Sequence, residues 1–294
     1  MELFNLSPAH PIVGQILAQP GINAGEFELR HFPDGESYIR VDSDINANDG
    51  AEAAIFCELS SPDDKLLSLL FLADTLRDLG WRNIRLLTPY LPYMRQDIRF
   101  KPGEGITSRY FARILSASFD HLITIDPHLH RYNSLDEIYT LSSQVLTASE
   151  SIAHWIRSEV PGGVIVGPDS ESDQWVSSVA RMAGCEQLVF NKTRAGDKDV
   201  SIDAGDLSQF KGRTPIMVDD IISTGRTMIE AAEQMVSMGL NPPVCIGVHA
   251  LFADDAWQAM QQAPIERIVS CNTIPHPSNA IDITGVMLKG LLES

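Results

Sequence analysis

Short apolar runs alternate with amphipathic segments along most of this chain. The runs are typical of buried strands in a parallel sheet, and they lie at residues 53–59, 83–87, 121–125, 163–167, 187–190, 215–218, 244–251 and 267–270. Apolar positions at helical spacing predict helices at residues 62–79, 107–118, 142–158, 171–183, 226–238, 253–262 and 282–292. This alternation predicts an α/β fold with two doubly wound, mostly parallel sheets and a domain boundary near residue 142.

The segment PIMVDDIISTGRT at 215–227 joins a predicted strand to a predicted helix. Asp219 and Asp220 fall at the carboxyl end of the strand, where open parallel sheets bind ligands. The loop that follows consists of Ser223, Thr224, Gly225, Arg226 and Thr227. Unpaired N–H groups at the helix N-terminus favour an anion, and Gly225 lets the backbone approach a phosphate closely. Helix capping explains one such residue but not this series, so the segment indicates a sugar phosphate site whose acids suit ribose hydroxyls.

Candidate metal ligands follow two other predicted strands. His128 comes after the run at 121–125, and Asp169 comes after the run at 163–167. The two could share a magnesium ion, although imidazole is an unusual ligand for magnesium and contact through ATP or water is the better account. Taken alone, each residue is better explained as a hydrogen-bonded histidine or a helix cap.

Three loops carry further candidates. After the run at 83–87, two prolines exclude a helix and shape a loop that presents Arg95 and Gln96. The turn FPDGES at 32–37 lies between two alternating segments and predicts a hairpin, a role that Pro-Asp-Gly fills without any ligand. The polar segment 191–198 is either a mobile lid that carries Lys192 and Arg194 or a solvated hairpin.

Composition limits the possible functions. The chain has 294 residues and a formal net charge of -17, which argues against a surface for nucleic acid or an anionic membrane. No apolar stretch approaches the roughly 20 residues that span a bilayer, and the first residues lack a signal-peptide pattern, so we expect a cytoplasmic protein. The widely spaced Cys57, Cys185, Cys245 and Cys271 indicate reduced thiols rather than a zinc site or disulfides.

In this order and spacing, FPDGE, YMRQD, DPH, GPD, KTR and VDDIISTGRT resemble the ribose-phosphate diphosphokinases, also called 5-phosphoribosyl 1-diphosphate (PRPP) synthetases. The resemblance covers nearly the entire chain. It implies two domains of phosphoribosyltransferase type I-like fold, at 1–142 and 143–275, with the segment 276–294 leading back to the first. It also implies a homo-oligomer with shared sites that uses Mg2+, ATP and ribose 5-phosphate.

The resemblance also implies a role for each motif. Asp34, Gly35 and Glu36 would contact the adenine of ATP bound to a neighbouring subunit, and Arg95 and Gln96 would also contact ATP. His128 and Asp169 correspond to magnesium positions, and Lys192 and Arg194 to cations of a catalytic flexible loop. The ribose 5-phosphate site would comprise Arg194, Asp219, Asp220, Ser223, Thr224, Gly225, Arg226 and Thr227.

Several segments depart from the commonest pattern of this family. DPHLHRYNSLDEIY, GPDSES and STGRT are more similar to an archaeal-type branch. Ser223 replaces a carboxylate and Arg226 replaces a glycine, which affects the expected sugar phosphate affinity more than the reaction type. Two alternatives to a PRPP synthetase stay open, namely a phosphoribosyltransferase that consumes PRPP and a non-catalytic regulatory homologue.

Overall fold

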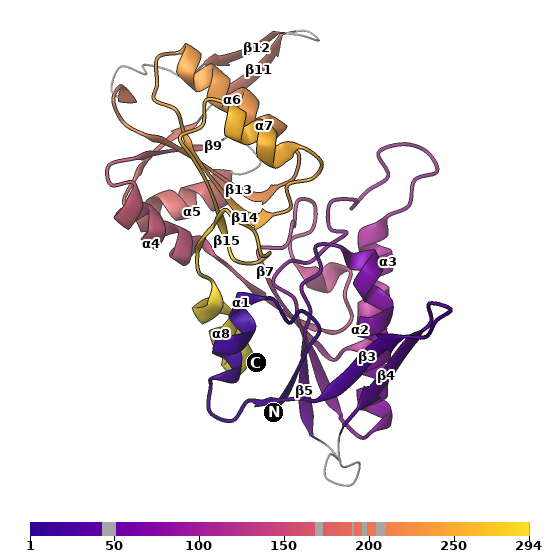
Figure 1. Cartoon of the computed structure of the whole chain (residues 1–294). Helices are drawn as coiled ribbons and strands as arrows, with labels where there is room; N and C mark the ends of the chain where they lie inside the picture. Colours follow the sequence, from indigo (N-terminus) through magenta and orange to yellow (C-terminus); the bar gives the residue numbers. More distant parts are fainter. Residues whose placement is uncertain (43–50, 168–172, 190, 196–198, 204–209, 294) are drawn as a thin grey trace. The chain divides into compact units, whose positions relative to one another are not determined.

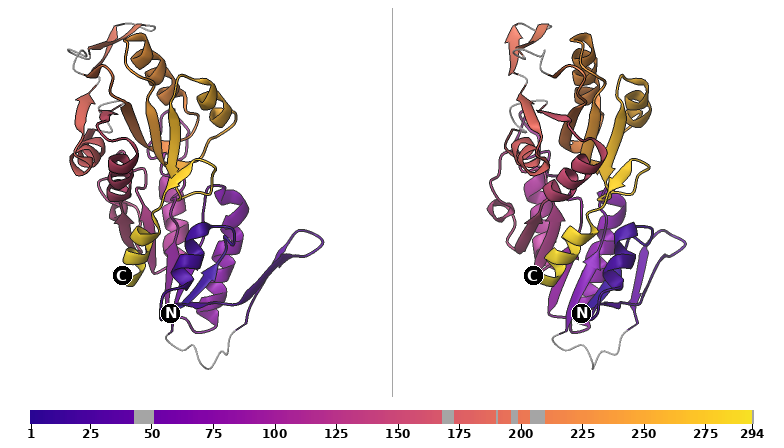
Figure 2. Two further views of the ribbon diagram at one scale, coloured as in Figure 1. Left: turned by 60° about the vertical axis from the view of Figure 1, so that its left-hand side comes forward. Right: turned by 90° about the vertical axis from the view of Figure 1, so that its left-hand side faces the viewer.

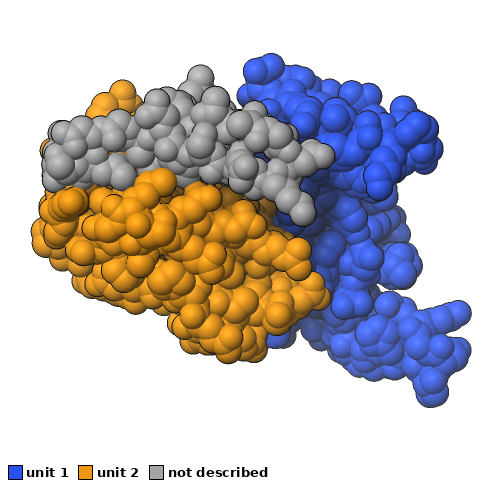
Figure 3. All heavy atoms as spheres, turned by 90° about the horizontal axis from the view of Figure 1, so that it is seen from above, with its two compact units in different colours: residues 1–146, 273–275, 284–294 blue, residues 147–272, 276–283 orange. Residues whose placement is uncertain are grey.

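The computed structural model describes residues 1–42, 51–167, 173–189, 191–195, 199–203 and 210–293, with the backbone alone for 173–175, 189, 191–195 and 199–203. The chain forms two compact units (Figure 3). The first contains Met1–Leu146, Thr273–Pro275 and Thr284–Ser294, and the second contains Thr147–Asn272 and His276–Ile283. The chain therefore passes from the first unit to the second and returns to the first for its final helix.

The first unit is built on a six-stranded sheet in the order β2-β1-β5-β6-β7-β8, in which all neighbours are parallel. Its strands are β1 (Glu2–Asn5), β2 (Asn23–Ala24), β5 (Glu52–Phe56), β6 (Asn83–Leu87), β7 (His121–Ile125) and β8 (Ser142–Leu146). Its helices are α1 (Pro11–Leu17), α2 (Pro62–Asp78), α3 (Thr107–Ser118), the short 3-10 helix η1 (Leu135–Glu137) and α8 (Thr284–Glu293). Helices α2 and α3 cover one face of the sheet, and α1 and α8 cover the other (Figure 1).

An antiparallel hairpin of β3 (Phe27–His31) and β4 (Ser37–Val41) extends from this first sheet (Figure 2). Its outer end is the turn that contains Gly35, whose φ of 94° suits glycine. The hairpin predicted around FPDGES is therefore confirmed.

The second unit repeats the architecture with a parallel sheet in the order β10-β9-β13-β14-β15-β16. Its strands are β9 (Val164–Gly167), β10 (Glu186–Val189), β13 (Pro215–Ile222), β14 (Val244–Ala250), β15 (Arg267–Cys271) and β16 (Asn279–Ile281). Its helices are α4 (Ser149–Glu159), α5 (Asp173–Ala183), α6 (Arg226–Ser237) and α7 (Ala256–Gln262). A separate antiparallel pair is formed by β11 (Asn191–Ala195) and β12 (Asp199–Asp203). The α/β class with two mostly parallel sheets is thus confirmed.

Each unit has its own hydrophobic core. In the first, Trp81 is fully buried and meets the ring of Phe4 edge-on at 5.8 Å. In the second, buried methionines and Cys245 fill the space between the sheet and its helices. All four cysteines are free thiols, as predicted, and only Cys185 is partly exposed. None of the helices in the described parts of the chain has the length and apolar character that crossing a bilayer requires.

The helix predicted at 142–158 is wrong in its first part. Residues Ser142–Leu146 form strand β8, which pairs with β7 in register His121↔Ser142, and helix α4 begins only at Ser149. The sequence SSQVL lacks the continuous apolar run of a central strand because β8 lies at the edge of its sheet. Since β8 belongs to the first sheet, the units divide after Leu146, and the segment 276–283 belongs to the second unit because β16 pairs with β15.

Candidate functional site

Strand β13 carries the two acids of the predicted ribose site. It extends beyond the predicted end at Val218 to Ile222, because pairing with β14 continues through Asp219↔Gly247 and Ile222↔Ala250. Asp219 and Asp220 therefore lie inside the last part of the strand and are half-buried. The carboxylate of Asp219 accepts a hydrogen bond from the N–H of Asp220 at 2.9 Å, which orients the first acid.

The loop after β13 ends at the N-terminus of α6, as predicted. Gly225 is the N-cap residue, and its φ of 67° lies in the left-handed region that glycine tolerates. A glycine has no side chain with which to cap the helix, so the first N–H groups of α6 are left for another acceptor. Thr224, Arg226 and Thr227 are exposed beside it. These groups lie together at the carboxyl edge of the second sheet, in the arrangement that the sequence predicts for an anion site.

The chain after β14 braces this loop. The N–H groups of Phe252 and Ala253 donate to the carbonyl oxygens of Ile222 and Ser223, each at 3.0 Å. The ring of Phe252 stacks on His276 with 4.4 Å between ring centroids, and burial lowers the pKa of that histidine. The loop between β13 and α6 is therefore attached to the chain that follows the neighbouring strand of the same unit.

In the first unit, the loop with Arg95 and Gln96 is held at several points. Tyr93 has a φ of 64°, and its hydroxyl donates to Asp63 at the start of α2, which raises the pKa of Tyr93 to about 12. The Oε1 of Gln96 accepts a hydrogen bond from the hydroxyl of Thr107 at 2.9 Å, whereas Arg95 is exposed. The loop is thus a fixed support that presents an arginine to solvent.

His128 lies in the loop after β7, at the carboxyl edge of the same sheet. Its half-buried ring stacks on His130 with 5.5 Å between centroids and 16° between ring planes. The loop begins at Asp126, which has a φ of 35° and donates its N–H to the carbonyl oxygen of Leu146 at 2.9 Å. The structure brings this loop next to the Arg95 loop, because Arg131 forms an ion pair with Asp97 at 2.9 Å.

Backbone groups of the hairpin turn form hydrogen bonds within the turn itself. The N–H of Phe32 donates to the carbonyl oxygen of Glu36 at 2.8 Å, and the carboxylate of Asp34 accepts from the N–H of Glu36 at 3.3 Å. Asp34, Gly35 and Glu36 are all exposed. The geometry accounts for the turn without a ligand and leaves the carboxylate of Glu36 accessible at its outer end.

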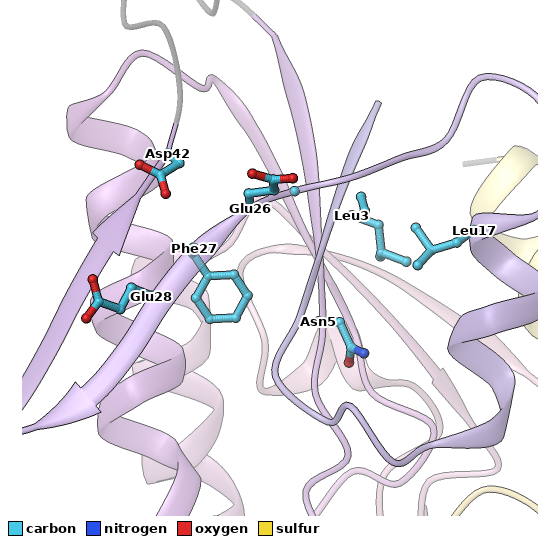
Figure 4. Close-up of a pocket in the computed structure, with 9 residues that line it drawn as sticks. Leu3, Asn5, Leu17, Glu26, Phe27, Glu28 and Asp42 are labelled. Atoms are coloured by element: carbon cyan, nitrogen blue, oxygen red, sulfur yellow. The ribbon is translucent and has the colours of Figure 1, made fainter.

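A pocket of about 390 Å³ lies where the hairpin leaves the first sheet (Figure 4). It is lined by Leu3, Asn5, Leu17, Ala24, Gly25, Glu26, Phe27, Glu28 and Asp42. Its charged groups are carboxylates, and two of them pair with Arg40, at 3.6 Å for Glu28 and 2.9 Å for Asp42. An acidic lining disfavours a phosphate, and the pocket contains none of the predicted site residues.

Two family models match the chain in succession. The N-terminal domain of ribose phosphate pyrophosphokinase matches residues 1–118, and the phosphoribosyl transferase domain matches residues 134–284. Ribose-phosphate pyrophosphokinase from Thermococcus kodakarensis is 32% identical over 276 residues, which cover 93% of this chain and 94% of the relative. The chain belongs to the ribose-phosphate pyrophosphokinase family.

Further members of the ribose-phosphate pyrophosphokinase family show similar agreement. The protein of this name from Pyrococcus furiosus is 31% identical and covers 89% of this chain and 91% of its own length. The crystal structure of phosphoribosylpyrophosphate synthetase from Mycobacterium smegmatis has a TM-score of 0.84, covering 99% of this chain and 98% of the other. That protein is 23% identical to this chain, so the likeness establishes the shared fold.

The remaining predicted residues of the family pattern are placed only in part. Lys192 and Arg194 lie on strand β11, for which the structure describes the backbone, and Asp169 lies outside the described residues. Within the described residues, no group of three or more His, Cys, Asp or Glu side chains is arranged to hold a metal ion. Sequence reasoning did not single out Asp97 and Arg131, although Asp97 follows Arg95 and Gln96 directly in the YMRQD motif.

Proposed function

We propose that this protein is a ribose-phosphate diphosphokinase that transfers the β,γ-diphosphoryl group of MgATP to ribose 5-phosphate. The observation that carries the proposal is the match of both family domains over nearly the whole chain. A simple phosphoribosyltransferase would account for the second unit and its phosphate loop, but it would not account for the matched N-terminal domain.

The proposed sugar phosphate contacts are in the second unit. The N–H groups at the start of α6 and the hydroxyls of Thr224 and Thr227 would donate to the 5-phosphate. Asp219 and Asp220 would accept hydrogen bonds from ribose hydroxyls at the end of β13. Asp219 and Asp220 shortly precede the loop along the chain, an order that suits a ligand with an anion at one end and hydroxyls at the other.

The proposed ATP contacts are in the first unit. Arg95 would hold a nucleotide phosphate through its planar guanidinium group, and Gln96 would fix the loop that carries it. His128 would lie at the magnesium position on the adjacent loop. We also propose that Asp34, Gly35 and Glu36 contact the adenine of ATP on a neighbouring subunit. The turn is exposed, and hydrogen bonds within it pair its own backbone groups, so its outer surface is accessible to another subunit.

Magnesium fits this arrangement as part of MgATP. The described residues offer no complete cage of protein ligands, and magnesium commonly binds through one or two protein groups together with substrate phosphates. His128 would contribute one contact, and Asp169 is the proposed carboxylate. When bound, the ion would neutralise charge on the phosphate oxygens of ATP.

The reaction needs no covalent enzyme intermediate. The anomeric hydroxyl oxygen of ribose 5-phosphate forms a bond to the β-phosphorus of ATP and loses its proton to solvent. The bond from the β-phosphorus to the oxygen that bridges it to the α-phosphorus breaks, and AMP leaves with that oxygen. The protein's contribution is positioning together with positive charge on the transferred oxygens, which we assign to Lys192 and Arg194.

Three finer proposals accompany the reaction. The DPH and GPD motifs favour an archaeal-type member of the family, and the shared adenine site requires a homo-oligomer. A cytoplasmic location remains a prediction from the sequence.

The direct test is to incubate the pure protein with MgATP and ribose 5-phosphate and to separate the products. A diphosphokinase forms AMP and PRPP in equal amounts. A phosphoribosyltransferase forms neither from these substrates and instead consumes PRPP when a base is supplied. Intact nucleotide binding without any turnover would favour the non-catalytic regulatory homologue and contradict the proposal.

A further inference from the structure

An ion pair joins the two loops to which ATP contacts are assigned. The Nη1 atom of Arg131 lies 2.9 Å from Oδ1 and 3.1 Å from Oδ2 of Asp97. Asp97 follows directly after Arg95 and Gln96, and Arg131 lies three residues after His128. The pair is therefore a connection between the arginine loop after β6 and the histidine loop after β7.

The two partners differ in their environment. The side chain of Asp97 is 1% exposed and that of Arg131 is 40% exposed. A buried carboxylate is tolerated only when a cation or several donors compensate for its lost hydration, so Asp97 depends on Arg131 more than the reverse. If the partner is removed, the carboxylate of Asp97 loses its compensating charge, and a local shift that brings it to water would displace the adjacent Arg95 and Gln96.

A second contact fixes the same two loops. The hydroxyl of Tyr132 donates to the carbonyl oxygen of Asp97 at 3.2 Å, and it accepts from the Nε–H of Arg109 on α3 at 3.3 Å. The guanidinium group of Arg131 also lies over the ring of Phe100, 5.5 Å from its centroid. The side chain and the backbone of Asp97 are thus both held by the residues that follow His128.

We propose that Asp97 and Arg131 form a positioning pair that sets Arg95 and Gln96 relative to His128 for MgATP. The inference rests on the proposed function, since it assigns ATP phosphate to the first loop and magnesium to the second. Neither residue of the pair needs to touch the nucleotide. A purely structural ion pair would contribute to stability alone, whereas a positioning pair also sets the affinity for MgATP.

The main variant is Arg131→Gln in the full-length protein. We expect its KM for MgATP and the dissociation constant of MgATP, measured by calorimetry without ribose 5-phosphate, to rise about tenfold or more, because small displacements of binding groups are costly. The KM for ribose 5-phosphate should stay within about twofold, since its proposed residues are in the other unit. Arg131→Lys should recover most of the affinity, because a single nitrogen makes both contacts with the carboxylate.

The matched control is Arg77→Gln, which removes an ion pair with Asp120 of 2.9 Å in the same unit. Its midpoint of thermal unfolding should fall without a change in MgATP affinity. If Arg131→Gln does not fold, Tyr132→Phe tests the same connection, because it removes only the hydroxyl contacts, and its MgATP dissociation constant should rise about threefold.

Two results would contradict the proposal that Asp97 and Arg131 act as a positioning pair. One is parental MgATP affinity in Arg131→Gln, or in Tyr132→Phe where the first variant does not fold. The other is an equal rise of both substrate KM values, which would indicate general disorder. Parental protein that binds MgATP but forms no AMP would refute the proposed function instead, and the calorimetric comparison would still decide whether the pair sets nucleotide affinity.

Discussion

The thioether of Met260 occupies the space that a side chain on Gly225 would need. A Cβ atom on Gly225 would lie 2.6 Å from Sδ of Met260, which is well inside van der Waals contact. Gly225 also has a φ of 67°. The N-cap position of α6 therefore favours glycine for two independent reasons, the backbone conformation and the lack of space for a side chain.

Gly225→Ala should destabilise the protein by about 2–4 kcal/mol, combining the left-handed backbone with overpacking against Met260. The KM for ribose 5-phosphate should rise at least about tenfold, because the N–H groups that would bind the phosphate shift. Urea unfolding and steady-state kinetics measure the two effects. Gly239→Ala is the control, since Gly239 has a φ of 82° with open space around it, and its effect should be about 1 kcal/mol without a change in KM.

The double substitution Asp219→Asn and Asp220→Asn should weaken ribose 5-phosphate much more than ATP. Hydrogen bonds to charged groups contribute roughly 1.5–3 kcal/mol, so the KM for the sugar phosphate should rise at least about tenfold. Asp255→Asn, an exposed acid before α7, serves as the control for lost charge. Equal weakening of both substrates would contradict the assignment of these acids to the ribose.

Lys192→Ala or Arg194→Ala should lower kcat by roughly 10³, or about 4 kcal/mol, while both KM values change little. We expect this split because the two cations are proposed to act on charge that develops in the transition state. The double variant should lose much less than the product of the single losses, since groups that act together are non-additive. If either single variant kept a near-normal kcat at saturating substrates, the catalytic role would be refuted, and β11 and β12 would be only a solvated hairpin.

Activity should be restored when two inactive variants are mixed. A Glu36→Ala subunit would lack the adenine contact that we propose it makes in its neighbour's site, and a Lys192→Ala subunit would lack the proposed catalytic cation of its own site. In hetero-oligomers some sites would contain neither lesion. Verified mixtures that remain inactive would show that the hairpin does not serve an adjacent subunit.

The stability of the protein should fall as the pH drops from 7.5 to 5.5. Burial lowers the pKa of His10, His121 and His276 below 6.5, so the native state binds protons less readily than the unfolded chain. The contribution of these histidines to the free energy of unfolding is therefore present above about pH 6.5 and is lost as the pH falls below it. Urea midpoints across this range should vary less in His121→Gln than in the parent, and the exposed His154→Gln should match the parent. If the urea midpoint of His121→Gln varied with pH as steeply as that of the parent, His121 would be excluded as a source of the pH dependence.

The central strands and most helices could be predicted from the sequence, because the local pattern of apolar residues determines them. The central strands are apolar on both faces, and the helix that begins at Arg226 has apolar residues at helical spacing, among them Met228, Ala232 and Met235. Edge strand β8 was missed because its side chains are only partly buried, and the end of β13 was misplaced because cross-strand pairing continues past Val218. These errors arise where tertiary pairing decides the structure.

In the candidate site, too, features set by local sequence could be predicted, and features set by tertiary contacts could not. The candidate phosphate loop at 223–227 is predicted from contiguous residues, whereas the proposed roles of Asp169, Lys192 and Arg194 come from family resemblance rather than from geometry. The contact between Asp97 and Arg131 joins residues that lie 34 apart in the sequence, and an exposed arginine gives no periodic signal. Only the folded sheet, which brings the ends of β6 and β7 together, reveals it.

The return of the chain to its first unit has a consequence for synthesis on the ribosome. Helix α8 packs so closely on β8 that a Cβ on Gly290 would lie 2.6 Å from a methyl carbon of Leu146, and the carbonyl oxygen of Leu291 accepts a hydrogen bond from Arg85. Residues 1–146 therefore emerge with α1 in place but without the cover that α8 gives to the same face of the sheet, and that part stays uncovered while the second unit is translated. Nascent chains stalled before residue 284 should bind chaperones through the area that α8 later covers, and their release should coincide with the appearance of α8.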